Sequence, residues 1–231
     1  IRLEVEVLII QGLSTQIKNL TKVVYRAGLD VEDLVVGVLA SAEAVLSKRQ
    51  KVLGAAVLNI GSSTASLAVF EEGDVIYTKI IPVGSAHITS DLAIGLRSSL
   101  DTAEEIKIKY GNANPQTIDK REDIDLSNIT EGEIGVVSRR HTAEIIEARV
   151  EEIFKLADSE LAKIEKSGKL PAGIILTGGG AKLNGILEAA RRIFRLPSSI
   201  GYPRGDIITA IDKINDPSLT TALGLVLWGN N

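Results

Sequence analysis

The chain contains no cysteine, and this absence narrows the chemistry that it can carry. Disulfides and thiolate metal sites are excluded, and a chain without cysteine fits a reducing compartment. Only two histidines are present, so we do not expect a histidine-rich metal site. The formal net charge of −4 lacks the basic excess of nucleic-acid-binding proteins, so no nucleic-acid partner is expected.

Methionine is absent too, and aromatic residues make up only 3% of the sequence. A core must therefore consist mostly of isoleucine, leucine, valine and alanine, and 231 residues with 45% hydrophobic content suffice for one. No apolar run approaches the ~20 residues of a membrane span. Because an open reading frame begins with methionine, we expect a piece of a longer protein, unless modified methionines are left out of the sequence.

Two short apolar runs flank a polar turn near residue 60. The turn consists of Gly61, Ser62, Ser63 and Thr64. The β-branched runs on either side predict two strands. Such a turn can direct backbone N–H groups and three hydroxyls at one anion, with glycine allowing close approach. On this stretch alone, an ordinary hairpin with a polar tip is the favoured interpretation.

A second turn is built from Gly178, Gly179 and Gly180. Residues 173–177 predict a buried strand before it, and apolar residues at helical spacing follow from Leu183. Bare glycines between a strand and a helix suit a loop that admits a flat ligand or a phosphate. A tight strand-to-helix turn is the alternative, but it rarely needs three glycines in a row.

Together, the two turns resemble those of the actin-like ATPase superfamily, which includes actin, sugar kinases and heat-shock chaperones. Three further segments resemble the FtsA family of bacterial cell-division proteins: Pro-Val-Gly-Ser-Ala-His-Ile-Thr-Ser-Asp-Leu-Ala at 82–93, Ala-Glu-Glu-Ile-Lys at 103–107 and Asn-Asp-Pro at 215–217. The resemblance runs through nearly the whole chain in order. Two alternatives stay open, namely the PilM family of type IV pilus adaptors and an active phosphotransferase of the same fold.

The resemblance implies an α/β protein with the actin-like (ribonuclease H-like) fold, truncated at both ends. The expected segments are 1–50 (end of subdomain 1C and part of 1A), 51–98 and 173–215 (subdomain 2A, with a five-stranded type of sheet), 99–172 (the smaller α/β subdomain 2B) and 216–231 (a helix returning to 1A). The family's first phosphate loop would precede Ile1. Its membrane-binding amphipathic helix would follow Asn231.

The resemblance also implies a site for ATP with Mg²⁺ between subdomains 1A and 2A. Gly61, Ser62, Ser63 and Thr64 would hold the phosphates, and Gly178, Gly179 and Gly180 the adenosine side. Glu104 and Lys107 would close over the sugar; from the residues alone they are a solvated i,i+3 ion pair on a helix.

No catalytic residue is identified, because Asn59 stands where many superfamily members carry aspartate. A neutral amide organises Mg²⁺ and its water less well than a carboxylate. We therefore expect ATP binding with weak or absent hydrolysis.

Arg149 and Glu152 match the Arg-x-x-Glu with which the FtsA family docks the C-terminal peptide of FtsZ. The alternative is that they are solvated helix charges. Either way, we expect both side chains to be exposed and unnecessary for the core. The resemblance further implies self-association into filaments and a location on the cytoplasmic face of the cell membrane, where the family anchors the FtsZ ring.

Periodicity and capping residues predict the remaining elements. Strands are expected at 2–10, 34–39, 54–60, 64–71, 74–82 and 198–201. Helices are expected after Ser14, over 42–46, after Ser85 or Thr89, over 102–110, over 139–166 with Ser138 as cap, after Leu183, and after Asp216-Pro217. The carboxylate of Asp91 should interact favourably with the dipole of its helix. The buried face of the last helix should consist of Leu219, Ala222, Leu223, Val226 and Leu227.

Overall fold

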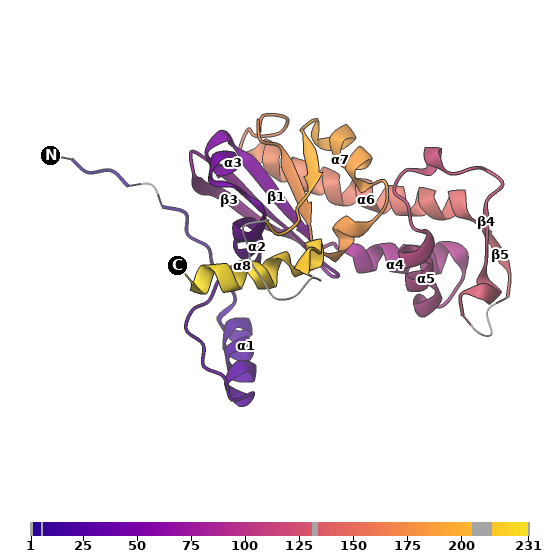
Figure 1. Ribbon diagram of the computed structural model, residues 1–231, viewed down its shortest axis with the longest axis horizontal. Helices are drawn as coiled ribbons and strands as arrows, with labels where there is room; N and C mark the ends of the chain where they lie inside the picture. Colours follow the sequence, from indigo (N-terminus) through magenta and orange to yellow (C-terminus); the bar gives the residue numbers. More distant parts are fainter. Residues whose placement is uncertain (1, 6, 131–133, 205–213, 231) are drawn as a thin grey trace.

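The computed structural model describes residues 2–5, 7–130, 134–204 and 214–230, and a five-stranded mixed sheet lies at its centre (Figure 1). The strand order is β3-β2-β1-β6-β7; β1 to β3 form an antiparallel meander, while β1, β6 and β7 run parallel. The strands are β1 (Ala55–Ile60), β2 (Ala65–Glu71), β3 (Asp74–Ile81), β6 (Ile174–Thr177) and β7 (Ser198–Ile200). The predictions at 54–60, 64–71, 74–82 and 198–201 are confirmed to within one residue at each end.

Both faces of β1 and β2 are buried, and because successive side chains of a strand point to opposite faces, they belong to two different cores. The edge strand β3 is largely exposed or half-buried. Along β1, Leu58 and Ile60 belong to a large core formed with the first group of helices, whereas Ala55 and Val57 belong to a core formed with the second. The first group is α4 (Ser85–Leu96), α6 (Arg139–Lys163) and α7 (Ile186–Phe194). The second group is α2 (Gly37–Val45) and α8 (Thr220–Gly229), next to the short α3 (Lys48–Leu53).

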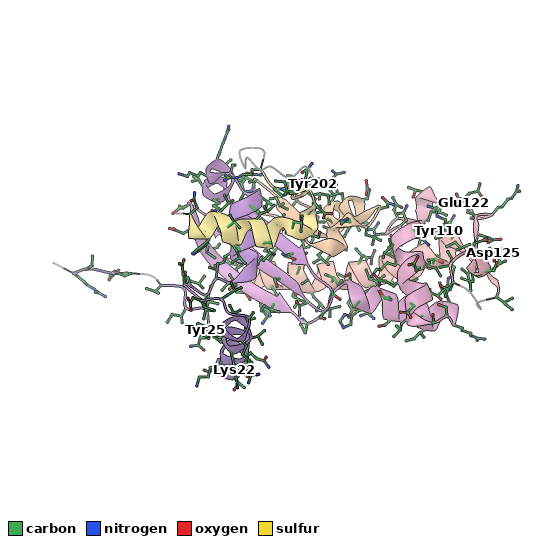
Figure 2. The ribbon with its side chains drawn as sticks, turned by 60° about the horizontal axis from the view of Figure 1, so that its bottom comes forward. Lys22, Tyr25, Tyr110, Glu122, Asp125 and Tyr202 are labelled. Carbon is green, nitrogen blue, oxygen red and sulfur yellow. The ribbon has the colours of Figure 1, made fainter. Side chains whose placement is uncertain are left out.

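Helix α6 is the longest element and joins the sheet to a small second layer. Ser138 caps it as predicted, since its hydroxyl accepts the N–H of His141 at 3.4 Å, and His141 is exposed as expected. The predicted apolar stripe from Ile146 to Leu161 is buried against the sheet. The second layer consists of α5 (Leu100–Tyr110), η1 (Pro115–Thr117), η2 (Leu126–Asn128) and the hairpin of β4 (Asp123–Asp125) with β5 (Val136–Ser138). Figure 2 shows Glu122 and Asp125 at this end of the molecule, far from Lys22 and Tyr25 of α1.

The last helix begins as predicted but buries a different face. Asp216 accepts the N–H of Ser218 at 2.8 Å and caps the short η5 (Pro217–Leu219), which leads into α8. Leu219, Ala222 and Val226 are exposed, whereas Thr220 and Gly224 are buried. The predicted face is wrong because α8 crosses α2 closely: a Cβ at Gly224 would collide with the carbonyl oxygen of Ala40. Only Leu223 and Leu227 of the predicted set pack partly against this core.

Three predictions before the sheet need correction. The described residues of 2–10 have no regular structure, since none of them pairs with another described strand, and a strand depends on such a partner. Residues 34–36 are irregular, and α2 begins at Gly37, which replaces the strand at 34–39 and lengthens the helix predicted at 42–46. Helix α3 was not predicted, although Ser47 and Gln50 form a capping box.

Helix α1 (Ser14–Arg26) forms as predicted, with Leu13 rather than Ser14 at the cap position. None of its residues is buried, and Figure 1 shows it standing apart from the sheet. None of its apolar residues belongs to the hydrophobic clusters of the described residues.

Candidate functional site

The two predicted turns meet at one edge of the sheet. Parallel pairing sets Asn59 opposite Thr177, so β1 and β6 end side by side. The polar turn from Gly61 follows β1, and the glycine turn from Gly178 follows β6. Carboxyl ends of parallel strands are the usual place for ligands in open α/β sheets.

The polar turn is held by its backbone and leaves its hydroxyls unpaired. Gly61 N–H donates to the carbonyl of Thr64 at 2.9 Å, closing the turn. Ser62, Ser63 and Thr64 are exposed, and no described residue hydrogen-bonds to their hydroxyls. Three hydroxyls at one tip could therefore bind an anion without breaking an existing hydrogen bond.

The same turn caps helix α4, which corrects a prediction. The N–H groups of Ser85 and Ala86 donate to the carbonyls of Gly61 and Ser62 at 2.9 and 2.8 Å. Neither Ser85 nor Thr89 caps the helix; Gly84 is the cap residue, and a Cβ there would lie 2.5 Å from the Ser62 carbonyl. The first turn of α4 is thus fastened to the polar turn.

The three glycines of the second turn have different roles. Gly178 has φ +86°, and a Cβ there would lie 2.5 Å from the carbonyl oxygen of Ile60. At Gly180 an added Cβ would lie 2.5 Å from the side chain of Ile60. Gly179 is exposed, and nothing lies within 4 Å of its added Cβ. The outer glycines are therefore required by packing, and only Gly179 faces open space.

The candidate residues that line a cleft fall into two clefts rather than one, and Ser62, Ser63 and Gly178 line neither of the two. Gly61 and Thr64 line the turn cleft, about 570 Å³ in volume, together with Asn59 and residues 9–11. Glu104, Lys107, Gly179 and Gly180 line the glycine cleft, about 500 Å³ in volume. Ser85 also lines the glycine cleft, and its hydroxyl donates to the Gly61 carbonyl at 3.1 Å. The clefts are therefore neighbours on either side of the first turn of α4.

A polar network at the glycine cleft fixes Glu104 and Lys107. Lys107 Nζ donates to Glu104 Oε2 (2.6 Å), Thr89 Oγ1 (2.8 Å) and the Ser85 carbonyl (3.3 Å), which uses all three ammonium protons. Thr89 Oγ1 in turn donates to Glu104 Oε2 at 2.5 Å. Burial raises the pKa of Glu104, but the hydrogen bonds from Lys107 and Thr89 outweigh it and lower the pKa overall.

Glu104 is the member of this pair that a ligand can reach. Its side chain is 44% exposed, against 12% for Lys107. Its Oε1 accepts no hydrogen bond from the described residues, so this ionised oxygen could accept one from a ligand hydroxyl. Thr89, predicted only as a possible helix cap, is a buried part of the network. Its i,i+4 spacing from Ser85 was the available signal in the sequence.

Lys182 at the rim of the glycine cleft is engaged with the start of α8. Its ammonium donates to Asp216 Oδ2 at 2.7 Å. The hydrogen bonds from Lys182 and Ser218 lower the pKa of Asp216 to about 2. The cap residue of η5, which leads into α8, is thereby joined to the glycine turn.

Comparison with known proteins identifies the family of the chain. A sequence model of the family "Cell division protein FtsA" matches residues 56–224. The chain belongs to the FtsA family. It is 39% identical over 230 residues to the FtsA of Neisseria meningitidis serogroup B, covering 98% of this chain and 55% of that protein. The chain spans about half the length of the curated relatives it matches.

Solved structures show that the fold of this FtsA-family chain is actin-like. MreB5 of Spiroplasma citri, in a crystal structure bound to ADP, matches with a TM-score of 0.74 at 20% identity, over 95% of this chain and 66% of that one. The PilM–PilN type IV pilus biogenesis complex matches with a TM-score of 0.70 at 18% identity, over 93% and 58%. The predicted fold class and family are thereby confirmed.

Asn59 of this FtsA-family chain is tied to the helices behind the sheet. Its Nδ2 donates to the hydroxyls of Ser41 of α2 (2.9 Å) and Thr221 of α8 (3.0 Å). These two hydroxyls also hydrogen-bond to each other at 2.7 Å. The amide therefore joins β1 to both helices at the wall of the turn cleft.

Arg149 differs from its prediction. Its side chain is only 23% exposed, and Nε and Nη2 donate to Asp91 of α4 at 2.5 and 2.8 Å. Nη1 donates to Glu152 at 2.5 Å, and Glu152 is exposed as predicted. The expectation that Arg149 is exposed is wrong, because its hydrogen bonds to Asp91 hold the guanidinium between α6 and α4. The same hydrogen bonds raise the pKa of Arg149.

Asp91 lies in the middle of α4 and pairs with this guanidinium. The prediction that it interacts mainly with the helix dipole is therefore wrong.

No helix in the described part of the chain is long and apolar enough to cross a membrane. No group of three or more potential metal ligands is found among the described residues either.

Proposed function

We propose that the chain binds ATP at the edge of the sheet where β1 and β6 end. The proposal rests on the hydroxyls of the polar turn and on one carboxylate oxygen of Glu104. These groups lie on either side of α4 and make no hydrogen bond to the described residues. The three free hydroxyls of the polar turn suit the phosphates, and the free Oε1 of Glu104 suits a ribose hydroxyl. Gly179 leaves room for the adenosine side. The ADP bound to the MreB5 neighbour supports a nucleotide on this fold.

Magnesium would accompany ATP under this proposal. Its ligands would be mainly phosphate oxygens and water, as is usual for Mg²⁺ in nucleotide sites. The Asn59 amide, already bonded to Ser41 and Thr221, is a weaker metal ligand than a carboxylate. This supports weak or absent hydrolysis, with ATP acting chiefly as a structural ligand. An active phosphotransferase of the same fold would instead release phosphate at an appreciable rate.

The proposed biological role is that of the FtsA family, in bacterial cell division. The protein would self-associate into filaments and anchor the FtsZ ring at the cytoplasmic face of the cell membrane. Arg149 and Glu152 would bind the C-terminal peptide of FtsZ, and the boundaries proposed for subdomains 1C, 1A, 2A and 2B stay those of the sequence analysis. Membrane contact through a C-terminal helix is part of the same proposal. A PilM-like pilus adaptor is the second candidate, favoured only by the fold of the PilM–PilN neighbour.

Replacing Thr64 with valine should weaken ATP binding about fivefold to tenfold while leaving the melting temperature unchanged. Valine keeps the shape of threonine but removes a hydroxyl, and one lost hydrogen bond costs about 1 kcal/mol. Isothermal calorimetry with ATP on the purified full-length protein measures the effect. Thr78→Val is the matched control, because Thr78 lines the same cleft from β3 and lies outside the turn.

Equal ATP affinity in Thr64→Val and Thr78→Val would remove the polar turn from the phosphate site. A drop in melting temperature without loss of affinity would favour the ordinary hairpin interpretation.

A further inference from the structure

Arg149 is anchored by a residue on another helix. Asp91 of α4 accepts one hydrogen bond from Nε and another from Nη2 of Arg149 on α6. The Asp91 side chain is 27% exposed, so the pair is shielded from much of the solvent. A two-point pair fixes the plane of the guanidinium as well as its position.

The hydrogen bonds of Arg149 leave part of its donor capacity unused. A guanidinium carries five N–H donors. Asp91 accepts two of them, and Glu152 accepts a third from Nη1. One N–H therefore remains on each terminal nitrogen. These two groups suit a carboxylate or a carbonyl of a partner peptide, provided that the guanidinium keeps its orientation.

The exposure of the two acceptors separates their roles. Glu152 is the outer acceptor, with 51% of its side chain exposed, and a partner could displace it at small cost. Asp91 is the inner acceptor, held in the middle of α4, whose first turn is fastened to the polar turn. A peptide that binds here therefore contacts a guanidinium whose Nε and Nη2 groups are already held by Asp91.

We infer that Asp91 is a positioning residue for the partner peptide, holding the Arg149 guanidinium between α4 and α6 so that its two remaining N–H groups bind an acidic or carbonyl group of the peptide. The inference rests on the proposed docking of the FtsZ peptide at Arg149. Under this inference Asp91 contributes to peptide binding, in addition to linking α4 to α6.

A double-mutant cycle on peptide binding distinguishes positioning from a merely structural role. Fluorescence anisotropy with labelled C-terminal peptide of FtsZ is measured for wild type, Asp91→Asn, Arg149→Gln and the double variant. Asp91→Asn should weaken binding about tenfold in the wild-type background and have no further effect when Arg149 is already glutamine. Asp91→Glu, which keeps the carboxylate, should recover part of the affinity.

Arg192→Gln is the matched control on the other side of α6. Arg192 donates to Glu147 and Glu151 at 2.8 and 2.7 Å and joins α7 to α6, as Asp91 joins α4 to α6. This variant should lose stability comparably and bind the peptide like wild type. If Asp91→Asn fails to fold, the cycle is run with Asp91→Glu, whose longer side chain should still weaken binding only when Arg149 is present.

Unchanged affinity in the Asp91 variants would overturn the inference. An equal loss in both the wild-type and the Arg149→Gln backgrounds would also overturn it, because Asp91 would then act without Arg149. If wild type does not bind the peptide at all, the proposed docking of FtsZ at Arg149 fails. This result differs from the one that overturns only the inference, in which wild type and the Asp91 variants bind the peptide equally well.

Discussion

Replacing Gly178 with alanine is expected to lower the free energy of unfolding by about 3 kcal/mol or more and to abolish ATP binding. The backbone at Gly178 has φ +86° and ψ 172°, a region that costs other residues about 1–3 kcal/mol. The added Cβ would also lie 2.5 Å from the Ile60 carbonyl oxygen and 2.6 Å from Asn59 Oδ1. The end of β6 would have to move away from the end of β1, which separates the two halves of the proposed site.

Chemical denaturation and ATP calorimetry measure the two effects of Gly178→Ala. Gly179→Ala is the control, because a Cβ at the neighbouring glycine meets nothing within 4 Å. Its free energy of unfolding should stay within about 0.5 kcal/mol of wild type. Equal stability of the two variants would show that the glycine turn is not packed against β1 as described.

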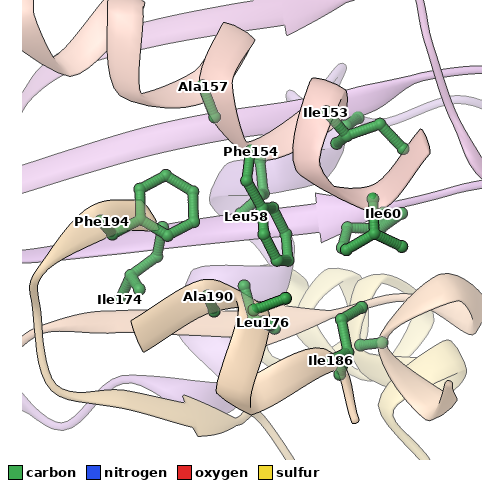
Figure 3. Close-up of a cluster of buried hydrophobic side chains, with 14 of the residues drawn as sticks. Leu58, Ile60, Ile153, Phe154, Ala157, Ile174, Leu176, Ile186, Ala190 and Phe194 are labelled. Carbon is green, nitrogen blue, oxygen red and sulfur yellow. The ribbon is translucent and has the colours of Figure 1, made fainter. Parts of the chain in front are cut away.

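Replacing Phe154 with alanine should cost about 3–5 kcal/mol of stability, the usual loss for a buried aromatic residue. Phe154 of α6 is fully buried between the helices and the sheet (Figure 3). Its ring centroid lies 5.1 Å from that of Phe194 in a tilted pair, a favourable geometry for aromatic rings. The substitution removes this ring contact and leaves a cavity in the core.

Leu156→Ala on the same helix is the matched control for Phe154→Ala. Its side chain is 38% exposed, so the change should cost far less than the loss at Phe154. Denaturant-induced unfolding followed by circular dichroism gives both values. A loss below about 1 kcal/mol in Phe154→Ala would contradict the position of α6 over the sheet.

The sequence predicted the sheet and α6 well because both carry strong local patterns. Strands β1 to β3 are β-branched runs separated by polar turns, and α6 combines a serine cap with a continuous apolar stripe. The failures lie where distant contacts decide. Gly224 is buried because α8 crosses α2 at Ala40, and no local pattern records that crossing. The described residues of 2–10 have strand-like alternation but no pairing partner among the described strands.

The candidate site divides in the same way. The resemblance to the actin-like superfamily pointed to Glu104 with Lys107 and to the two glycine-containing turns, and these lie around one edge of the sheet. Their hydrogen-bond partners were not predictable, because Thr89 and Asp91 are brought to Lys107 and Arg149 by the packing of α4 against α5 and α6. Which of the three glycines are required by packing could not be predicted either, because this depends on the position of Ile60.

The most direct measurement is ATP affinity in Gly179→Val compared with wild type, at matched melting temperature. The fold leaves space at Gly179, so valine should not disturb the free protein, but it should project into the cleft proposed for adenosine. Calorimetry on the purified full-length protein should show ATP binding by wild type and at least tenfold weaker binding by Gly179→Val, with equal melting temperatures. Equal affinities, or no ATP binding by wild type, would contradict a nucleotide site at this edge of the sheet.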